Sequence, residues 1–192
     1  MDVTSVTTHV GAWARVRPWI GLIARVVLAG VFLFAGGTKV GDLAASGRAV
    51  HAYELMPYGL ATAVGAALPF IEIAIGLLLL LGLATRLAGV LSAVLLSVFI
   101  AGIASVWARG LSIDCGCFGS GGELAPGQSP QYGSEIARDV VLLALAVFLV
   151  AYPRTPLSVD AYVLGDVVLE DDHEQQGEEQ ASQPGGTRAT GA

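Results

Sequence analysis

The sequence predicts an all-α polytopic membrane protein, built as a bundle of four transmembrane helices. Hydrophobic residues make up 54% of the 192 residues and charged residues only 14%, and the mean hydropathy is +0.68. A soluble domain carries roughly 25% charged residues, so an ordinary soluble enzyme is excluded. The apolar residues are also concentrated in four long runs, which are Trp19–Gly37, Leu60–Leu83, Leu87–Trp107 and Ile136–Tyr152.

The lengths of these runs suit a bilayer, because a spanning helix needs about 20 apolar residues. The first three runs have 19, 24 and 21 residues, and they are apolar nearly all round rather than along one stripe. The fourth has 17 residues and begins with Arg138 and Asp139, so its flanking side chains would have to reach the interface. The first run is open to an alternative as a cleaved signal peptide, but no clean cleavage site follows it and we expect a retained helix.

The connections between the runs set the expected topology. Two longer segments, 38–59 and 108–135, join the first run to the second and the third to the fourth. Four spans put both segments on one side of the membrane and both termini on the other. Arg25 adds positive charge on the terminal side, which favours cytoplasmic termini in a bacterial inner membrane. Pro69 lies inside the second run, where it predicts a helix kink.

The net charge of −6 belongs to the end of the chain. Residues 160–192 hold eight acidic residues and one arginine, a net charge of −7, whereas residues 1–159 have a net charge of +1. The body therefore has no basic face for nucleic acid. These patterns divide the chain into an N-terminal tail (1–18), a membrane domain (19–156), a juxtamembrane segment (157–169) and an acidic tail (170–192) that we predict to be disordered.

The chain contains two cysteines, Cys115 and Cys117, in a polar loop close to the end of the third run. A disulfide across a single residue strains the backbone, which Gly116 eases, and strained exposed disulfides are oxidising and labile. Asp114 precedes the pair, and its negative charge disfavours the thiolate of Cys115, whereas a helix terminus or a nearby arginine would favour it. This pattern favours thiol–disulfide exchange in an oxidising compartment, which puts the loop outside the cytoplasm. Two alternatives remain: the cysteines are inert, or they bind a metal with two further ligands such as His51.

Glu72 lies near the middle of the second run, where an ionised carboxylate is expensive unless it is paired. Arg25 is the other charge deep within a run, so we expect these two residues to form an interhelical pair. The alternative to this structural role is a functional one, in which Glu72 is part of a proton or quinone site. In the first connection, His51, Tyr53 and Glu54 form a polar cluster on the side of the cysteines, where they line a redox site or simply lie at the headgroup level.

Several motifs occur in the order found in a known family. The segment Arg25–Lys39 resembles the first helix of the DoxX-like membrane proteins. The motifs at Tyr53–Pro57, Leu68–Glu72 and Cys115–Gly119 resemble the MauE branch of that family, named after methylamine utilisation protein E. The resemblance covers residues 20–152 and implies a bacterial four-helix membrane protein. It also implies an extracytoplasmic thioredoxin-like partner that cooperates in disulfide formation in a client protein.

The leading hypothesis is therefore a membrane thiol–disulfide component, in which the two cysteines exchange electrons with that partner. This chain lacks the second cysteine pair of vitamin K epoxide reductase-like enzymes, so no cofactor is assigned and a quinone stays an open alternative. The alternatives are a non-catalytic scaffold for a maturation enzyme, and a small-solute or proton carrier centred on Glu72. The carrier would need an inverted repeat, which a homodimer could supply.

Overall fold

The computed structural model describes residues 3–114, 122–124 and 129–153. The described segments form five helices and one short antiparallel hairpin. The helices are α1 (Val3–Lys39), α2 (Leu43–Ala52), α3 (Tyr58–Leu81), α4 (Thr85–Ala108) and α5 (Tyr132–Ala151). The hairpin pairs β1 (Ile113–Asp114) with β2 (Gly122–Glu123).

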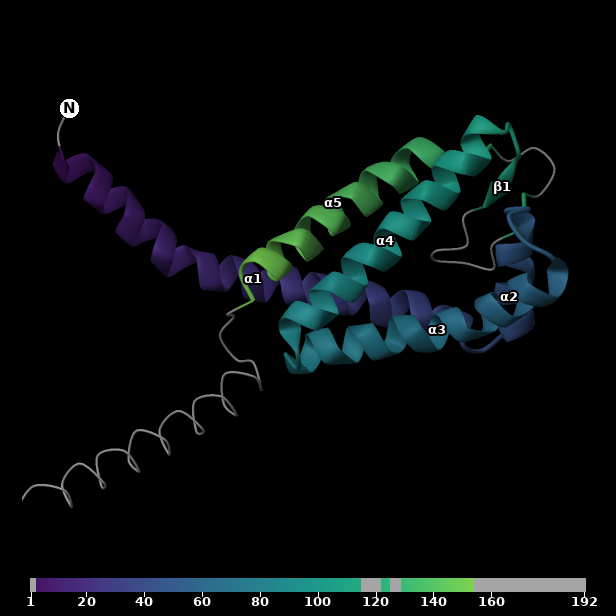
Figure 1. The fold of residues 1–192 in the computed structure, drawn as a ribbon, viewed down its shortest axis with the longest axis horizontal. Coiled ribbons are helices and arrows are strands. Elements are labelled where there is room, and N and C mark those ends of the chain that lie inside the picture. Colours follow the sequence, from purple (N-terminus) through teal and green to yellow (C-terminus); the bar gives the residue numbers. More distant parts are fainter. Residues whose placement is uncertain (1–2, 115–121, 125–128, 154–192) are drawn as a thin grey trace, which may run out of the picture.

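The four long helices form an elongated bundle with two different ends (Figure 1). One end carries α2 and the hairpin, which we call the loop end. The turn between α3 and α4 and the end of α5 lie at the opposite end. The two longer connections therefore lie on the same side of the bundle, as the sequence predicts.

Three of the described helices are long and apolar enough to cross a membrane: α1 over Val16–Lys39, α3 and α4. The chain is therefore a multi-pass helical membrane protein. Four spans were expected. The helix α5 is not among these three, because its first half contains three charged residues, Glu135, Arg138 and Asp139.

Several segments differ from the sequence expectations. The helix α1 begins at Val3, so most of the expected N-terminal tail is helical. The connection 38–59 contains α2, and the connection 108–135 contains the hairpin. The helix α3 continues through Pro69 without a break, and the kink expected there stays a prediction. The expected juxtamembrane segment and acidic tail lie outside the described residues.

Small residues bring α1 and α3 close together. A Cβ atom on Gly36 would lie 2.7 Å from the carbonyl oxygen of Pro69, and one on Gly76 would lie 2.7 Å from the side chain of Leu33. This close approach is typical of helix packing in membranes, where backbones meet over small side chains. The apolar core lies between α1, α3, α4 and α5, and its larger members are Leu28, Phe32, Ile75, Leu79, Leu96, Leu142 and Leu149.

The outward faces of the long helices stay apolar. Phe34 on α1, Ile71 on α3, Val98 on α4 and Val141 on α5 are all between 47% and 61% exposed. An isolated soluble bundle would cover such faces with polar residues. We therefore read these faces as lipid-contacting surfaces.

Candidate functional site

The two cysteines predicted to carry the chemistry, Cys115 and Cys117, lie outside the described residues, but the segments on either side of them are described. The strand β1 ends at Asp114 and β2 begins at Gly122, and these two residues pair across the hairpin. The segment that contains both cysteines therefore leaves and rejoins the fold at adjacent points of the loop end.

A tyrosine on α5 fixes the base of this hairpin. The hydroxyl of Tyr132 donates a hydrogen bond to the Leu111 carbonyl oxygen at 2.7 Å and accepts one from the Ile113 amide at 2.9 Å. Ile113 and Tyr132 are buried together with Ile103 and Val106 of α4 in a small second core. The hairpin is thus tied to both α4 and α5 by packing and by hydrogen bonds.

The helix α2 forms the other side of the loop end. Its first turn is capped by Asp42, whose carboxylate accepts a hydrogen bond from the Ala45 amide at 2.8 Å. It packs closely on α3, because a Cβ atom on Gly65 would lie only 2.5 Å from the Ser46 carbonyl oxygen. The helix α2 also contacts β2, so it connects the hairpin to the bundle.

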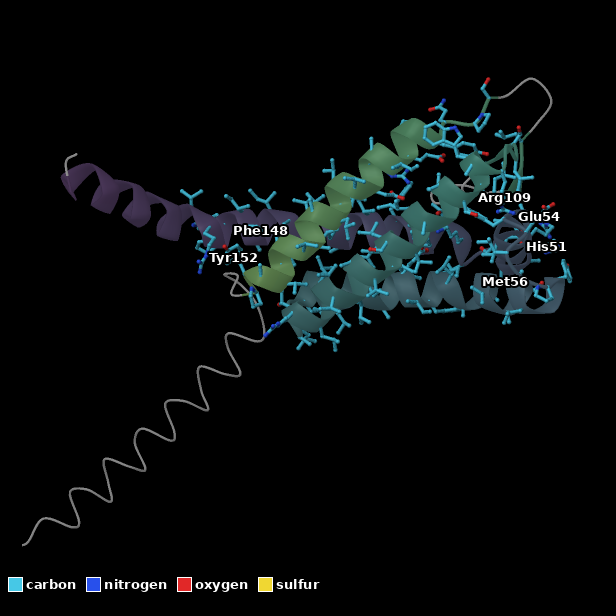
Figure 2. The ribbon with its side chains drawn as sticks, turned by 45° about the horizontal axis from the view of Figure 1, so that its top comes forward. His51, Glu54, Met56, Arg109, Phe148 and Tyr152 are labelled. Atoms are coloured by element: carbon cyan, nitrogen blue, oxygen red, sulfur yellow. The ribbon has the colours of Figure 1, made fainter. Side chains whose placement is uncertain are left out.

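Two of the residues singled out in the sequence, His51 and Tyr53, lie at the end of α2. Figure 2 labels His51 at this end of the bundle. The ring of His51 packs edge-on against Tyr58, with ring centroids 5.1 Å apart. The ring of Tyr53 lies against Gly102 of α4, and its carbonyl oxygen accepts a hydrogen bond from Arg109. These contacts bring both residues to the same end of the bundle as Asp114. Within the described segments, no group of three or more His, Cys, Asp or Glu residues lies close enough to hold a metal ion.

Glu72 is fully buried, as expected for the centre of a spanning helix, but its partner differs from the expected one. Lys39 Nζ donates hydrogen bonds to Glu72 Oε1 at 2.7 Å and to Oε2 at 3.0 Å. The side chains are 6% and 1% exposed. This is a buried, bidentate ion pair between the end of α1 and the middle of α3.

The expected pairing of Glu72 with Arg25 was wrong because of the register of α1 and α3. The two helices are antiparallel, and Arg25 and Glu72 would lie near each other only if the start of the first run lay level with the end of the second. Instead, Gly36 lies beside Pro69, so the end of α1 meets the middle of α3 and the first turns of α3 pack on α2. Arg25 is buried elsewhere on α1, 14 residues before Lys39, which is about 21 Å along the helix.

A second ion pair, in which Asp139 is buried and Arg138 is partly exposed, was not predicted. Arg138 Nε donates a hydrogen bond to Asp139 Oδ1 at 2.9 Å, and Asp139 is 2% exposed. Both residues line a small cavity together with Glu72. Their position at the start of the fourth apolar run suggested interface residues. Their adjacency to Glu72 depends on helix packing, which a single sequence does not reveal.

The spanning helices and the buried Lys39–Glu72 ion pair define a helical multi-pass membrane protein with a structured loop end. A family model described as methylamine utilisation protein MauE matches residues 17–152, from the spanning part of α1 to the end of α5. The chain therefore belongs to the MauE family, as the resemblance of its motifs implied. Neither the curated proteins nor the solved structures gave a significant match.

Proposed function

We propose that this MauE-family protein is an integral membrane thiol–disulfide component. Cys115 and Cys117 exchange electrons with a thioredoxin-like protein outside the cytoplasm, and that partner forms disulfides in a client protein. The family description links such proteins to methylamine utilisation. The client and the net direction of electron flow depend on the partner.

The observation that carries this proposal is the fixed hairpin base on either side of the cysteine segment. Thiol–disulfide exchange with a partner protein needs a cysteine pair that the partner can reach and a rigid part of the fold that holds this pair in position. The hydrogen bonds of Tyr132 and the packing of Ile113 supply such a support at the loop end. His51 and Glu54 lie exposed at the same end, where they present polar groups to a partner (Figure 2).

The exchange balances without an outside reagent. A thiolate of the partner attacks one sulfur of the Cys115–Cys117 disulfide, the sulfur–sulfur bond breaks, and the other cysteine leaves as a thiolate. The resulting mixed disulfide is resolved by the partner's second thiolate, which leaves the partner oxidised and the pair reduced. The reverse reaction passes through the same mixed disulfide, so one trapping experiment detects both directions.

We also propose that α5 is a fourth span and that the termini are cytoplasmic. Its 20 residues extend about 30 Å, the thickness of the hydrocarbon core. Arg138 and Asp139 neutralise each other within α5, and the helix packs along α4 and α1. Disulfide chemistry requires an oxidising compartment, so the loop end faces outward. Labelling of single cysteines at Ser112 and Ala84 in intact cells tests this orientation: a membrane-impermeant maleimide should modify only the first.

Trapping of the mixed disulfide tests the redox proposal. Cys115→Ser and Cys117→Ser variants are expressed in the native host, quenched with acid and separated without reductant. One of the two variants should carry a protein adduct that dithiothreitol removes, and the Cys115→Ser/Cys117→Ser double variant should carry none. Mass spectrometry of the adduct identifies the partner. If neither single variant captures a protein and the double variant supports normal client maturation, the redox proposal is wrong.

The same experiment separates the scaffold alternative. A scaffold would retain its partner through non-covalent contacts. Co-purification of an unchanged set of proteins with the double variant, without any adduct in the single variants, would favour a scaffold over thiol–disulfide exchange.

A further inference from the structure

A small cavity lies inside the bundle where α1, α3, α4 and α5 meet. Its volume is about 20 Å³. The polar groups that line it are Glu72 of α3 and the Arg138–Asp139 pair of α5, and the remaining lining residues are apolar, among them Ala35 and Phe99. A cavity needs roughly 10–15 Å³ of this kind of volume to hold one water molecule. The space therefore suits a single water.

Asp139 supplies the first reason to expect a polar occupant. Its Oδ1 atom interacts with Arg138, whereas its Oδ2 atom is buried and has no hydrogen-bond partner among the described residues. A buried carboxylate oxygen without a partner costs free energy, and such atoms in folded proteins are usually satisfied by protein groups or by ordered water. Because Asp139 lines the cavity, an occupant there is placed to donate a hydrogen bond to it.

Glu72 supplies a second acceptor at the same cavity. Its two oxygens accept hydrogen bonds from Lys39, but each carboxylate oxygen has a further lone pair available. A buried water needs two to four polar partners. A water in the cavity can donate its two hydrogens to the carboxylates of Glu72 and Asp139. The guanidinium of Arg138, which also lines the cavity, can donate a hydrogen bond to the water oxygen.

The charges around the cavity favour a neutral occupant over an ion. Two carboxylates face two cations, since Lys39 pairs with Glu72 and also acts electrostatically on Asp139, while Arg138 pairs with Asp139. The charged groups near the cavity come from α1, α3 and α5, and the cavity residues of α4 are apolar. A metal cation or an anion would leave this cluster with an excess charge inside the membrane, which is expensive.

We propose that this cavity is a binding site for one water molecule, which bridges Glu72 of α3 and Asp139 of α5. The water completes the hydrogen bonding of a four-charge cluster formed by Lys39, Glu72, Arg138 and Asp139. It thereby couples α5 to the α1–α3 pair across the centre of the bundle. This site is independent of the cysteine pair and does not rest on the proposed function.

Water–protein NMR on the full chain in detergent micelles tests this site. Methyl groups of leucine are labelled, and cross-peaks at the water frequency are recorded by nuclear Overhauser spectroscopy. The cavity-lining residues Leu96 and Leu142 should show cross-peaks to a long-lived water. Leu77, which is 46% exposed on the outer face of α3, should show none because detergent covers it.

Two variants with one matched control identify the source of the signal. Ala35→Val fills the cavity but keeps the exchangeable protons of Lys39, so loss of the cross-peaks would assign them to water. The double variant Arg138→Met/Asp139→Leu makes the cavity wall less polar and should also abolish them. Ala144→Val adds the same methyl groups on the exposed face of α5 and should keep them.

The proposal is overturned if the unmodified chain shows no water cross-peak at either leucine. It is also overturned if the cross-peaks persist at full intensity in Ala35→Val. Because the first of these outcomes requires no variant, the test stands even where a variant fails to fold.

Discussion

The centre of the bundle and its loop end use polar residues in opposite ways. At the centre, Lys39 and Glu72 are buried and pair with each other, and the Arg138–Asp139 pair lies beside them in an otherwise apolar core. At the loop end, most polar side chains are exposed, and the shape is fixed by bonds to backbone groups, such as those of Tyr132 and the Asp42 cap. The stability of the centre therefore depends on the balance of buried charges, whereas the shape of the loop end depends on hydrogen bonds to the backbone. Removal of a single polar side chain should therefore lower the free energy of unfolding most at the centre.

The largest effect is expected when one partner of the buried ion pair is removed. Lys39→Met leaves Glu72 as an uncompensated charge inside the membrane, and such losses cost about 3–5 kcal/mol. Unfolding of the purified protein in a mixed-micelle denaturant series measures this change. Lys39→Met/Glu72→Met removes both charges and should recover most of the lost stability. A double variant no more stable than the single one would contradict the pairing.

A smaller effect is expected where α2 meets α3. Gly65→Ala places a methyl group against the backbone of Ser46 and Gly47, and overpacking of this kind costs about 1–3 kcal/mol. Gly59→Ala is the matched control on the same helix, because nothing lies within 4 Å of its Cβ position. The control should be neutral or slightly stabilising, since glycine within a helix is unfavourable. Equal unfolding midpoints for the two variants would show that α2 does not pack as described.

The hairpin base should show a local effect. Tyr132→Phe removes the two hydrogen bonds to Leu111 and Ile113, which together contribute about 1–2 kcal/mol. Hydrogen exchange at the Ile113 amide should therefore accelerate about 5- to 30-fold, the factor that corresponds to this free energy. Tyr58→Phe removes an exposed hydroxyl and should leave that amide unchanged. Unaltered exchange at Ile113 in Tyr132→Phe would mean that packing alone holds the hairpin.

The smallest effect is expected at the exposed ion pair of the loop end. Arg48 Nη2 lies 3.9 Å from Asp42 Oδ2, and both side chains are more than 60% exposed. Solvent screens such pairs, so Arg48→Ala should change the free energy of unfolding by less than about 1 kcal/mol. A loss as large as that of Lys39→Met would remove the distinction between the two regions.

The sequence was sufficient for the class of fold, for the burial of Glu72 in an ion pair and for the family. The apolar runs predicted the spanning helices to within a few residues, because bilayer thickness sets their length directly. The position of Glu72 within an apolar run predicted a buried ion pair, because an unpaired carboxylate in the membrane is expensive. The MauE motifs predicted the family that the comparison shows.

The relative positions of the helices could not be read from the sequence. The choice between Arg25 and Lys39 as the partner of Glu72 depends on how far α1 is offset along α3, and that offset is set by close packing at Gly36 and Gly76. The helix α2 was predictable in part: Asp42 is a good N-cap residue and a helix-forming stretch follows it. Its 10 residues are too short for a span, so this segment lies between the membrane-length runs of the sequence and was expected to be a loop.

A redox titration of Cys115 and Cys117 tests the central claim most directly. The purified protein in lipid nanodiscs is equilibrated with glutathione buffers of increasing reducing strength, quenched, and labelled with a maleimide that adds mass to each free thiol. Thiol–disulfide exchange predicts a single transition from no labels to two, at a potential that glutathione reaches, because structural disulfides in secreted proteins titrate below about −300 mV. Two labels at every buffer ratio, or none even in the most reducing glutathione buffer, would contradict a thiol–disulfide role for this protein.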